Sequence, residues 1–217
     1  LSLAVGAQGL IVLNITGQMP EIVESGISAD LTGVSAYQDG FLACSDEGDL
    51  IASPDGLVWT VVPSMNHQPL RAIALSEQGQ AVAVGDQGTL VASQNGQSNL
   101  VGAMSDHDLH DIAYGLGRYV AVGSGDTILT SHNGLIWKKI SLGLATDWQA
   151  IDFKDGQFVI VGTQGTIAAS IDGLEYDVLQ QDQEINYVDV IMLSRQQTIV
   201  LDENGGIATR FNIRGIP

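Results

Sequence analysis

A repeat of about 39 residues runs through the chain and constrains its fold more than any other feature. Five apolar or aromatic residues, which we call the anchors, follow one another at intervals of 39 residues: Leu31, Leu70, Leu109, Trp148 and Tyr187. A glycine-rich turn recurs with almost the same spacing, at Gly9, Gly48, Gly88, Asp126, Gly165 and Gly205. A fixed period of this length is typical of an architecture in which each repeat buries its apolar face against its neighbours.

One repeat, residues 109–141, indicates what the repeating unit is. Two runs rich in β-branched and aromatic residues, 118–122 and 127–131, are separated by a glycine-rich turn, and the pair Asn133-Gly134 is a hairpin signal. Shorter strands are expected on either side, at 111–114 and 136–140. Four strands leave no room for a helix, and no stretch has a helical period.

The two middle strands of each repeat are almost continuously apolar, which predicts strands buried on both faces. Second strands are expected at 3–5, 41–44, 81–84, 118–122, 158–161 and 198–201, and third strands at 10–13, 50–53, 89–93, 127–131, 166–170 and 206–210. Four-stranded antiparallel sheets repeated in this way are the blades of an all-β β-propeller. Six turns predict six blades in a single domain over residues 1–217, with incomplete terminal repeats. A seven-bladed propeller with one blade missing from this chain is the alternative.

The turn after the third strand carries a motif, Ser-x-Asp/Asn-Gly-x-x-aromatic, which ends at Trp59, Trp137 and Tyr176. An Asp or Asn before Gly caps its own turn while the Gly takes a positive φ, and the Ser and the aromatic residue pin the hairpin. The motif resembles the Asp-box, or bacterial neuraminidase repeat. The chain is similar to secreted bacterial propellers and to the photosystem II stability/assembly-factor superfamily. The resemblance implies a bacterial, exported protein. The third repeat departs from the motif, because Ser93-Gln94-Asn95-Gly96 is not followed by the aromatic residue.

Charge narrows the range of partners. Of the 217 residues, 25 are Asp or Glu and 8 are Lys or Arg, a formal net charge of −17. Such a surface repels nucleic acid and anionic membranes. No apolar stretch approaches the roughly 18 residues of a membrane-spanning helix. The single cysteine, Cys44, lies in an apolar run and is expected to be a buried, inert thiol.

One short run has the composition of a metal site. Residues 106–111 lie in the loop that enters the fourth repeat, and the candidate ligands are Asp106, His107, Asp108, His110 and Asp111. Other loops at the same end of the propeller also carry acidic residues, at Asp46, Glu47, Asp86, Asp126, Asp202 and Glu203. Converging carboxylates can hold Ca²⁺, and the two histidines can instead hold a transition metal. The alternative is a solvated polar loop.

A second candidate site follows from the register of the repeat. The residues that come directly after the anchors are expected to encircle the channel entrance, and they vary: Thr32, Arg71, His110, Gln149 and Val188. The predicted ligand-binding set adds the two aromatic anchors and comprises Arg71, His110, Gln149, Trp148 and Tyr187. Variable polar and aromatic groups at one mouth suit a small polar molecule, a glycan or a peptide. The alternative is ordinary drift of surface residues.

No nucleophile elbow, P-loop or zinc motif is present in the sequence. The sequence therefore favours a non-enzymatic binding or scaffold propeller on the cell surface or outside the cell, with a protein, peptide or glycan partner. Such a propeller is also compatible with being one module of a longer protein. The alternative is a hydrolase or lyase that uses a divalent cation at the acidic mouth. A third reading, an assembly factor, has only the shared repeat in its favour.

Overall fold

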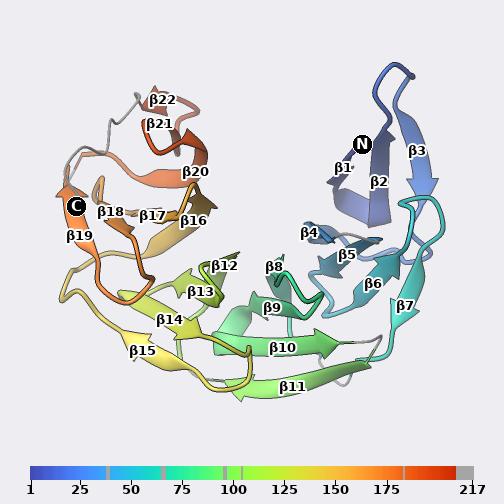
Figure 1. Ribbon diagram of the computed structural model, residues 1–217, viewed down its shortest axis with the longest axis horizontal. Helices are drawn as coiled ribbons and strands as arrows, with labels where there is room; N and C mark the ends of the chain where they lie inside the picture. Colours follow the sequence, from blue (N-terminus) through green and yellow to red (C-terminus); the bar gives the residue numbers. More distant parts are fainter. Residues whose placement is uncertain (38–39, 65–66, 95–96, 104, 183, 209–217) are drawn as a thin grey trace. The chain divides into compact units, whose positions relative to one another are not determined.

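The computed structural model describes residues 1–37, 40–64, 67–94, 97–103, 105–182 and 184–208. Their strands form six antiparallel sheets, which we number blades 1 to 6 in chain order (Figure 1). The chain divides into two compact units, unit 1 (Leu1–Asp106) and unit 2 (His107–Pro217), and each contains three blades. The two units are therefore described one at a time, and the single domain of residues 1–217 stays a prediction.

Unit 1 holds blades 1, 2 and 3. Blade 1 is three-stranded in the order β1-β2-β3, and blades 2 and 3 are four-stranded meanders. The strands of unit 1 are β1 (Ser2–Val5), β2 (Leu10–Asn14), β3 (Glu21–Glu24), β4 (Leu31–Tyr37), β5 (Gly40–Ser45), β6 (Leu50–Ser53), β7 (Thr60–Val62), β8 (Leu70–Leu75), β9 (Ala81–Gly85), β10 (Thr89–Gln94) and β11 (Gln97–Ala103). Two single 3-10 turns connect consecutive strands: η1 (Ala7–Gly9) joins β1 to β2, and η2 (Asp86–Gly88) joins β9 to β10.

Unit 2 holds blades 4, 5 and 6. Blades 4 and 5 are four-stranded, and the described part of blade 6 is three-stranded. The strands are β12 (Leu109–Gly115), β13 (Arg118–Gly123), β14 (Thr127–Ser131), β15 (Lys138–Ile140), β16 (Trp148–Lys154), β17 (Gln157–Gly162), β18 (Ile167–Ser170), β19 (Asp177–Gln180), β20 (Tyr187–Ser194), β21 (Gln197–Asp202) and β22 (Ile207–Ala208).

The sheets confirm the β-propeller predicted from the repeat. The bounds of the expected middle strands agree with those observed to within about one residue, apart from the expected strand 206–210. The last two residues of that strand lie outside the described residues, and so do Asn95 and Gly96 of the third hairpin. Consecutive first strands pack side by side within each unit, as β12 does on β16 and β16 on β20. No helix in the described part of the chain is long and apolar enough to cross a membrane.

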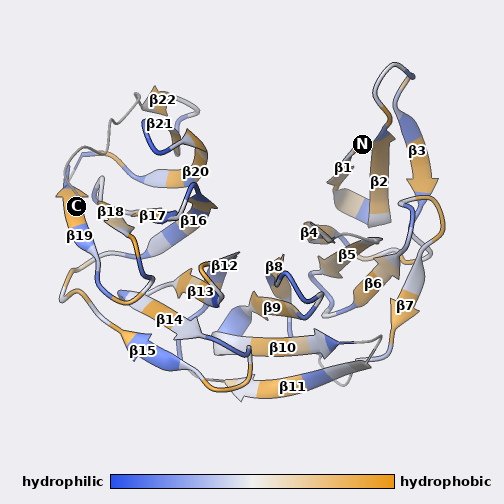
Figure 2. Cartoon of the chain, viewed as in Figure 1, coloured by the Kyte–Doolittle hydropathy of each residue, from blue (hydrophilic) through white to orange (hydrophobic). Residues whose placement is uncertain are grey.

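The core lies along the middle strands, which carry the most apolar residues. Every residue of β9 and of β17 is buried. Figure 2 shows the contrast along one blade, because β13 is drawn largely in the hydrophobic colour and the outer strand β15 in the hydrophilic one. The anchors begin the first strands and are buried as well; Leu70 and Trp148 are both fully enclosed. Their regular spacing is therefore the spacing of core residues.

The recurring turn owes its glycines to backbone geometry. Gly9, Gly88 and Gly165 have φ of 68°, 69° and 55°, in the left-handed region that glycine enters without strain. Asp126 takes the same place in blade 4 with φ of 53°, which is costly for a residue with a Cβ. The side chain of Asp126 offsets this cost, as the site below shows.

Candidate functional site

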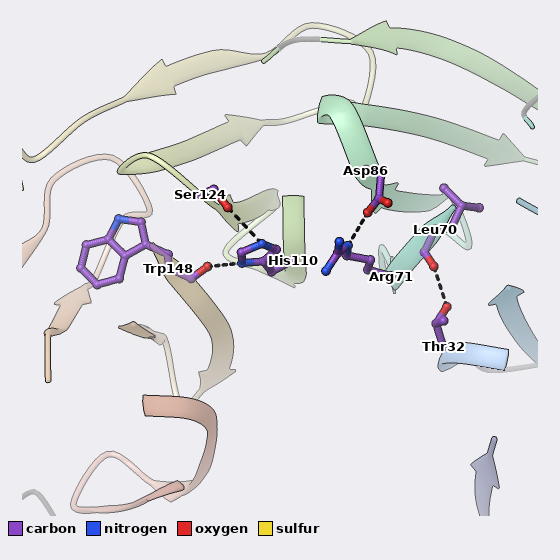
Figure 3. A network of polar contacts seen from close by, with 7 residues as sticks. All are labelled: Thr32, Leu70, Arg71, Asp86, His110, Ser124 and Trp148. Atoms are coloured by element: carbon purple, nitrogen blue, oxygen red, sulfur yellow. Dashed lines mark hydrogen bonds and ion pairs between the residues drawn. The ribbon is translucent and has the colours of Figure 1, made fainter. Parts of the chain in front are cut away.

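The residue after the anchor ties one blade to the next. In unit 1, the Thr32 hydroxyl donates to the carbonyl of Leu70, the next anchor, at 2.8 Å (Figure 3). In unit 2, the His110 ring bonds to the carbonyl of Trp148, again the next anchor, also at 2.8 Å. Two positions predicted to encircle the channel entrance therefore hold neighbouring first strands together.

The hydrogen bonds of His110 also determine which of its two ring nitrogens carries the hydrogen. Its Nδ1 faces the Trp148 carbonyl, which can only accept, so Nδ1 carries the hydrogen. Its Nε2 lies 3.2 Å from Ser124 Oγ, and in the neutral ring it accepts from that hydroxyl. Both ring nitrogens, either of which could bind a transition metal, are thus engaged in hydrogen bonds within unit 2.

Arg71, which also comes directly after an anchor, lies in unit 1 beside Asp86. Its guanidinium pairs with the Asp86 carboxylate (Figure 3), and the two side chains are 42% and 29% exposed. Ion pairs this exposed contribute at most about 1 kcal/mol. Arg71 therefore stays accessible at the surface, while Gln149 in unit 2 is half-buried and Val188 is exposed.

The aromatic anchors of the predicted ligand set lie in the core of unit 2. Trp148 is fully buried, and its indole Nε1 donates to Asp126 Oδ1 at 3.0 Å. Tyr187 is 1% exposed, and its hydroxyl accepts from Gln180 Nε2 at 3.0 Å. Burial raises the pKa of Tyr187 above its usual value, and the bond from Gln180 opposes this. Neither ring is exposed to a ligand.

Asp126, which the sequence placed among the acidic groups of the mouth, is a buried structural acceptor. Only 5% of it is exposed. Its Oδ2 accepts from the Ser141 hydroxyl at 2.7 Å and from three consecutive backbone N–H groups, those of Leu142, Gly143 and Leu144, at 2.8, 2.8 and 3.2 Å. Hydrogen bonds to a charged acceptor are roughly twice as strong as neutral ones. The loop between blades 4 and 5 is thereby folded around this carboxylate.

The residue before the anchor is a second recurrent clamp that sequence reasoning missed. Asp30, Asp147 and Asn186 each accept a backbone N–H from the turn of the preceding blade: from Gln8 at 2.7 Å, Gly125 at 2.8 Å and Gln164 at 3.0 Å. The signal was visible in the sequence, since Asp or Asn recurs directly before four of the five anchors. Many acidic residues at this end therefore bind backbone.

The run from Asp106 to Asp111 contains residues in different environments. Asp106 and His107 are exposed, whereas Asp108 is half-buried. Asp111 Oδ1 accepts from its neighbour Ile112 N at 2.8 Å, and Oδ2 from Ile151 N on the first strand of blade 5 at 2.9 Å. This carboxylate is a further bridge between blades.

Asp152 repeats the arrangement one blade later, and the two carboxylates affect each other. Its oxygens accept from Phe153 N and from Met192 N of blade 6, both at 2.7 Å. Burial raises the pKa of Asp111 to about 7; the carboxylates of Asp189 and Asp152 add to this, and the bonds from Ile151 and Ile112 oppose it.

The described residues contain no group of three or more His, Cys, Asp or Glu side chains arranged to hold a metal ion. The structure thus does not gather Asp106, His107, Asp108, His110 and Asp111 into one ligand shell. The cation at the acidic mouth stays a prediction from the sequence.

The hairpins that carry the Ser-x-Asp/Asn-Gly motif, residues 53–59, 131–137 and 170–176, have one common geometry; we call them the serine hairpins. In the first, Asp55 Oδ1 accepts from Leu57 N at 2.8 Å and Val58 N at 3.1 Å. Asn133 makes the equivalent bonds at 3.0 and 2.9 Å, and Asp172 at 2.8 and 2.9 Å. The Ser53 hydroxyl accepts from Gly56 N at 2.8 Å. The predicted capping role of the motif is confirmed.

Buried aromatic residues anchor the serine hairpins. Trp59 Nε1 donates to Gly56 O, and Trp137 Nε1 to Gly134 O, each at 3.1 Å.

The bonds from Leu57 and Val58 lower the pKa of Asp55. At Asp172, burial raises the pKa, but the bonds from Glu175 and Leu174 outweigh it, so that this pKa also lies below its usual value.

The tips of two serine hairpins present apolar side chains to solvent. Leu57 and Val58 in unit 1 are 45% and 64% exposed, and Leu135 and Ile136 in unit 2 are 52% and 76% exposed. These are the residues whose N–H groups the Asp or Asn holds. The exposed apolar pairs are therefore displayed on rigid backbone.

The chain matches no protein-family model and no curated protein in sequence. It is similar to solved propeller structures. YCF48 bound to D1 peptide is 17% identical with a TM-score of 0.70, covering 94% of this chain and 71% of that one. The nidogen/laminin complex gives 12% identity and a TM-score of 0.63, with 97% and 92% covered. A catalytically inactive virginiamycin B lyase from Staphylococcus aureus, solved with quinupristin, gives 9% and 0.77, with 94% and 78% covered. At these identities the likeness shows the fold, a β-propeller.

Proposed function

We propose that this chain is a non-enzymatic binding or scaffold propeller for a protein or peptide partner of neutral or basic character. The observation that carries the proposal is the pair of serine hairpins that hold exposed apolar residues on fixed backbone. Rigid apolar groups lose little conformational entropy on binding, and exposed apolar surface is typical of interaction sites. The net charge of −17 disfavours acidic partners.

Two of the similar structures are consistent with such a role. Their titles describe YCF48 bound to D1 peptide and a nidogen/laminin complex, which are a β-propeller with a bound peptide and one in a protein complex. The polar groups that the sequence suggested as metal ligands are instead largely used within the fold, as with His110, Asp111 and Asp126. The exported location rests on the sequence resemblance alone, and a glycan is the alternative partner that the variable residues after the anchors suggest.

Selection of peptides from a random phage library by the full chain tests the proposal, with a glycan array as a second arm. We expect enrichment of neutral or basic peptides, and weaker binding by the Leu57→Ser/Val58→Ser or the Leu135→Ser/Ile136→Ser variant. Equal melting temperatures of the variants and the wild type serve as the folding control. Absence of any enriched peptide, or retention of glycans only, would overturn the proposal of a protein or peptide partner.

A further inference from the structure

Unit 1 contains an apolar pocket beside its serine hairpin. Its volume is about 280 Å³, and it lies between blades 2 and 3, with Gly40, Phe41, Leu42, Ala52, Pro54 and Leu75 in its lining. Pockets for small-molecule ligands usually measure about 300–1,000 Å³. This one is therefore sized for a large side chain rather than for a cofactor.

The pocket exists because blade 2 lacks bulk that blades 4 and 5 have at the same repeat positions. Phe41 corresponds to Tyr119 and Phe158, which are fully buried, whereas Phe41 is half-buried. The cross-strand neighbour of Tyr119 is Tyr114, with ring centroids 4.8 Å apart, and that of Phe158 is Phe153, at 4.6 Å.

The corresponding neighbour of Phe41 is Ala36, which has no ring to cover it. Leu75 stands where blade 5 has Phe153, whose ring packs so closely over Gly115 of blade 4 that a Cβ there would lie 2.4 Å from it. Two aromatic rings that close this space in unit 2 are thus replaced by smaller residues in unit 1.

A third replacement opens the rim. In blade 4, Arg118 lies across the equivalent position, with Nη1 3.4 Å from Thr130 Oγ1 and Nη2 3.2 Å from His132 Nε2. Blade 2 has Gly40 in place of Arg118 and Ala52 in place of Thr130. The side chain that covers the blade in unit 2 is therefore absent, and the positive charge that it carries is absent with it.

Charge around the pocket is negative. The exposed carboxylates of Asp55 and Glu77 flank the lining residues Pro54 and Gly79 in the sequence. Within residues 1–106 there are eleven Asp and Glu and a single basic residue, Arg71, which pairs with Asp86. A cationic group near the pocket would meet only opposite charge on this rim.

We infer that the pocket binds one apolar side chain of a basic peptide segment, with an adjacent Lys or Arg of the peptide facing Asp55 and Glu77. The inference rests on the proposed function and assigns it a place, next to the exposed tip of Leu57 and Val58. Because Ser53 and Pro54 belong both to the serine hairpin and to the lining of the pocket, an extended peptide can lay an apolar anchor in the pocket and a cation beside the hairpin.

Backbone amide shifts of the full chain, recorded during titration with three acetylated peptides, test the inference. The probe is Gly-Lys-Leu-Lys-Gly, and the controls are Gly-Glu-Leu-Glu-Gly and Gly-Lys-Ser-Lys-Gly. We expect saturable shifts centred on Gly40, Leu42, Ala52 and Leu75 with the probe, and at least tenfold weaker binding of both controls. Binding of Gly-Glu-Leu-Glu-Gly as tight as the probe, or shifts centred elsewhere, would overturn the inference.

Variants that transplant the residues of unit 2 sharpen the test. Ala52→Thr and Leu75→Phe fill the pocket as Thr130 and Phe153 do, and we expect each to weaken the probe at least tenfold, whereas the isosteric Leu75→Ile retains binding. Asp55→Asn/Glu77→Gln keeps the hairpin, because Asn133 makes the same bonds, and we expect it to remove the preference for the cationic peptide. If phage-selected peptides bind but ignore all of these variants, the pocket is not the site while the proposed function stands; if no peptide binds, the proposed function itself fails.

Discussion

Replacement of Asp111 by Asn is the sharpest test of how the blades of unit 2 are joined. The folded-state pKa of Asp111 is raised from 3.8 to about 7, first by burial and then by Asp189 and Asp152. A raised carboxyl pKa means that the folded protein holds a proton that the unfolded chain releases. The stability that this proton provides is complete below about pH 4 and is lost as the pH rises through 7.

The shift sets the size of the effect. About three pKa units correspond to about 4 kcal/mol of unfolding free energy at one carboxyl group. In Asp111→Asn nothing titrates at this position, but one of the two acceptor oxygens is replaced by a donor, which costs about 1–3 kcal/mol at every pH. We therefore expect the variant to be less stable than the wild type at pH 4.5 and as stable or more stable at pH 8.

Urea unfolding followed by tryptophan fluorescence measures the difference at each pH, because Trp137 and Trp148 both lie in unit 2. Asp152→Asn alters the same pair of bonds one blade later, and because the Asp152 carboxylate also raises the pKa of Asp111, we expect this variant to change the pH dependence of stability only slightly. A difference between wild type and Asp111→Asn that stays constant from pH 4.5 to pH 8 would refute the reasoning.

Four further outcomes are expected. Asp172→Ala should lose about 1–2 kcal/mol of unfolding free energy at pH 7, whereas Asp172→Asn should lose little, because Asn133 makes the equivalent bonds. Because the pKa of Asp172 is lower in the folded protein than in the unfolded chain, its carboxylate stabilises the fold at pH values above the unfolded-state pKa, and this contribution should disappear as the pH falls through the folded-state pKa. Asp126→Ala should cost at least about 1–3 kcal/mol by denaturant unfolding, because it leaves the buried indole N–H of Trp148 and the partly buried N–H groups of Leu142 and Gly143 without their acceptor. Cys44 is fully buried and burial raises its pKa to about 11, so a thiol reagent at pH 8 should label it only after unfolding. The melting temperature of the protein in EDTA should equal that in excess Ca²⁺. A rise of several degrees with Ca²⁺ would contradict the assignment of carboxylates such as Asp111 and Asp126 to bonds with backbone N–H groups.

The strands of this protein could be predicted from its sequence because they obey local rules. Glycines with positive φ end the strands, and β-branched runs such as 118–122 fill them. The serine hairpins were equally readable, since the Asp or Asn bonds only to residues two and three positions ahead. Signals confined to a few residues leave a clear pattern in the chain.

The candidate site was harder to predict because its contacts are long-range. Trp148 and Tyr187 looked like mouth residues by chemistry, although their place in the anchor series with Leu70 and Leu109 already indicated the core. The role of Asp126 depends on N–H groups 16 to 18 residues later in the chain. The pocket of blade 2 could not be predicted, because it arises from the small size of Ala36 and Gly40 relative to the residues at the same strand positions in other blades, and the pairing of those strands is known only from the structure.

The propeller is proposed to bind a peptide without cleaving or chemically modifying it. Isothermal titration of the full chain with the best phage-selected peptide, followed by mass spectrometry of the recovered peptide, tests this most directly. We expect a saturable isotherm for the wild type, clear weakening in Leu57→Ser/Val58→Ser, and a peptide of unchanged mass. The absence of saturable heat would contradict the binding role, and a cleaved or modified peptide would show that the protein is an enzyme.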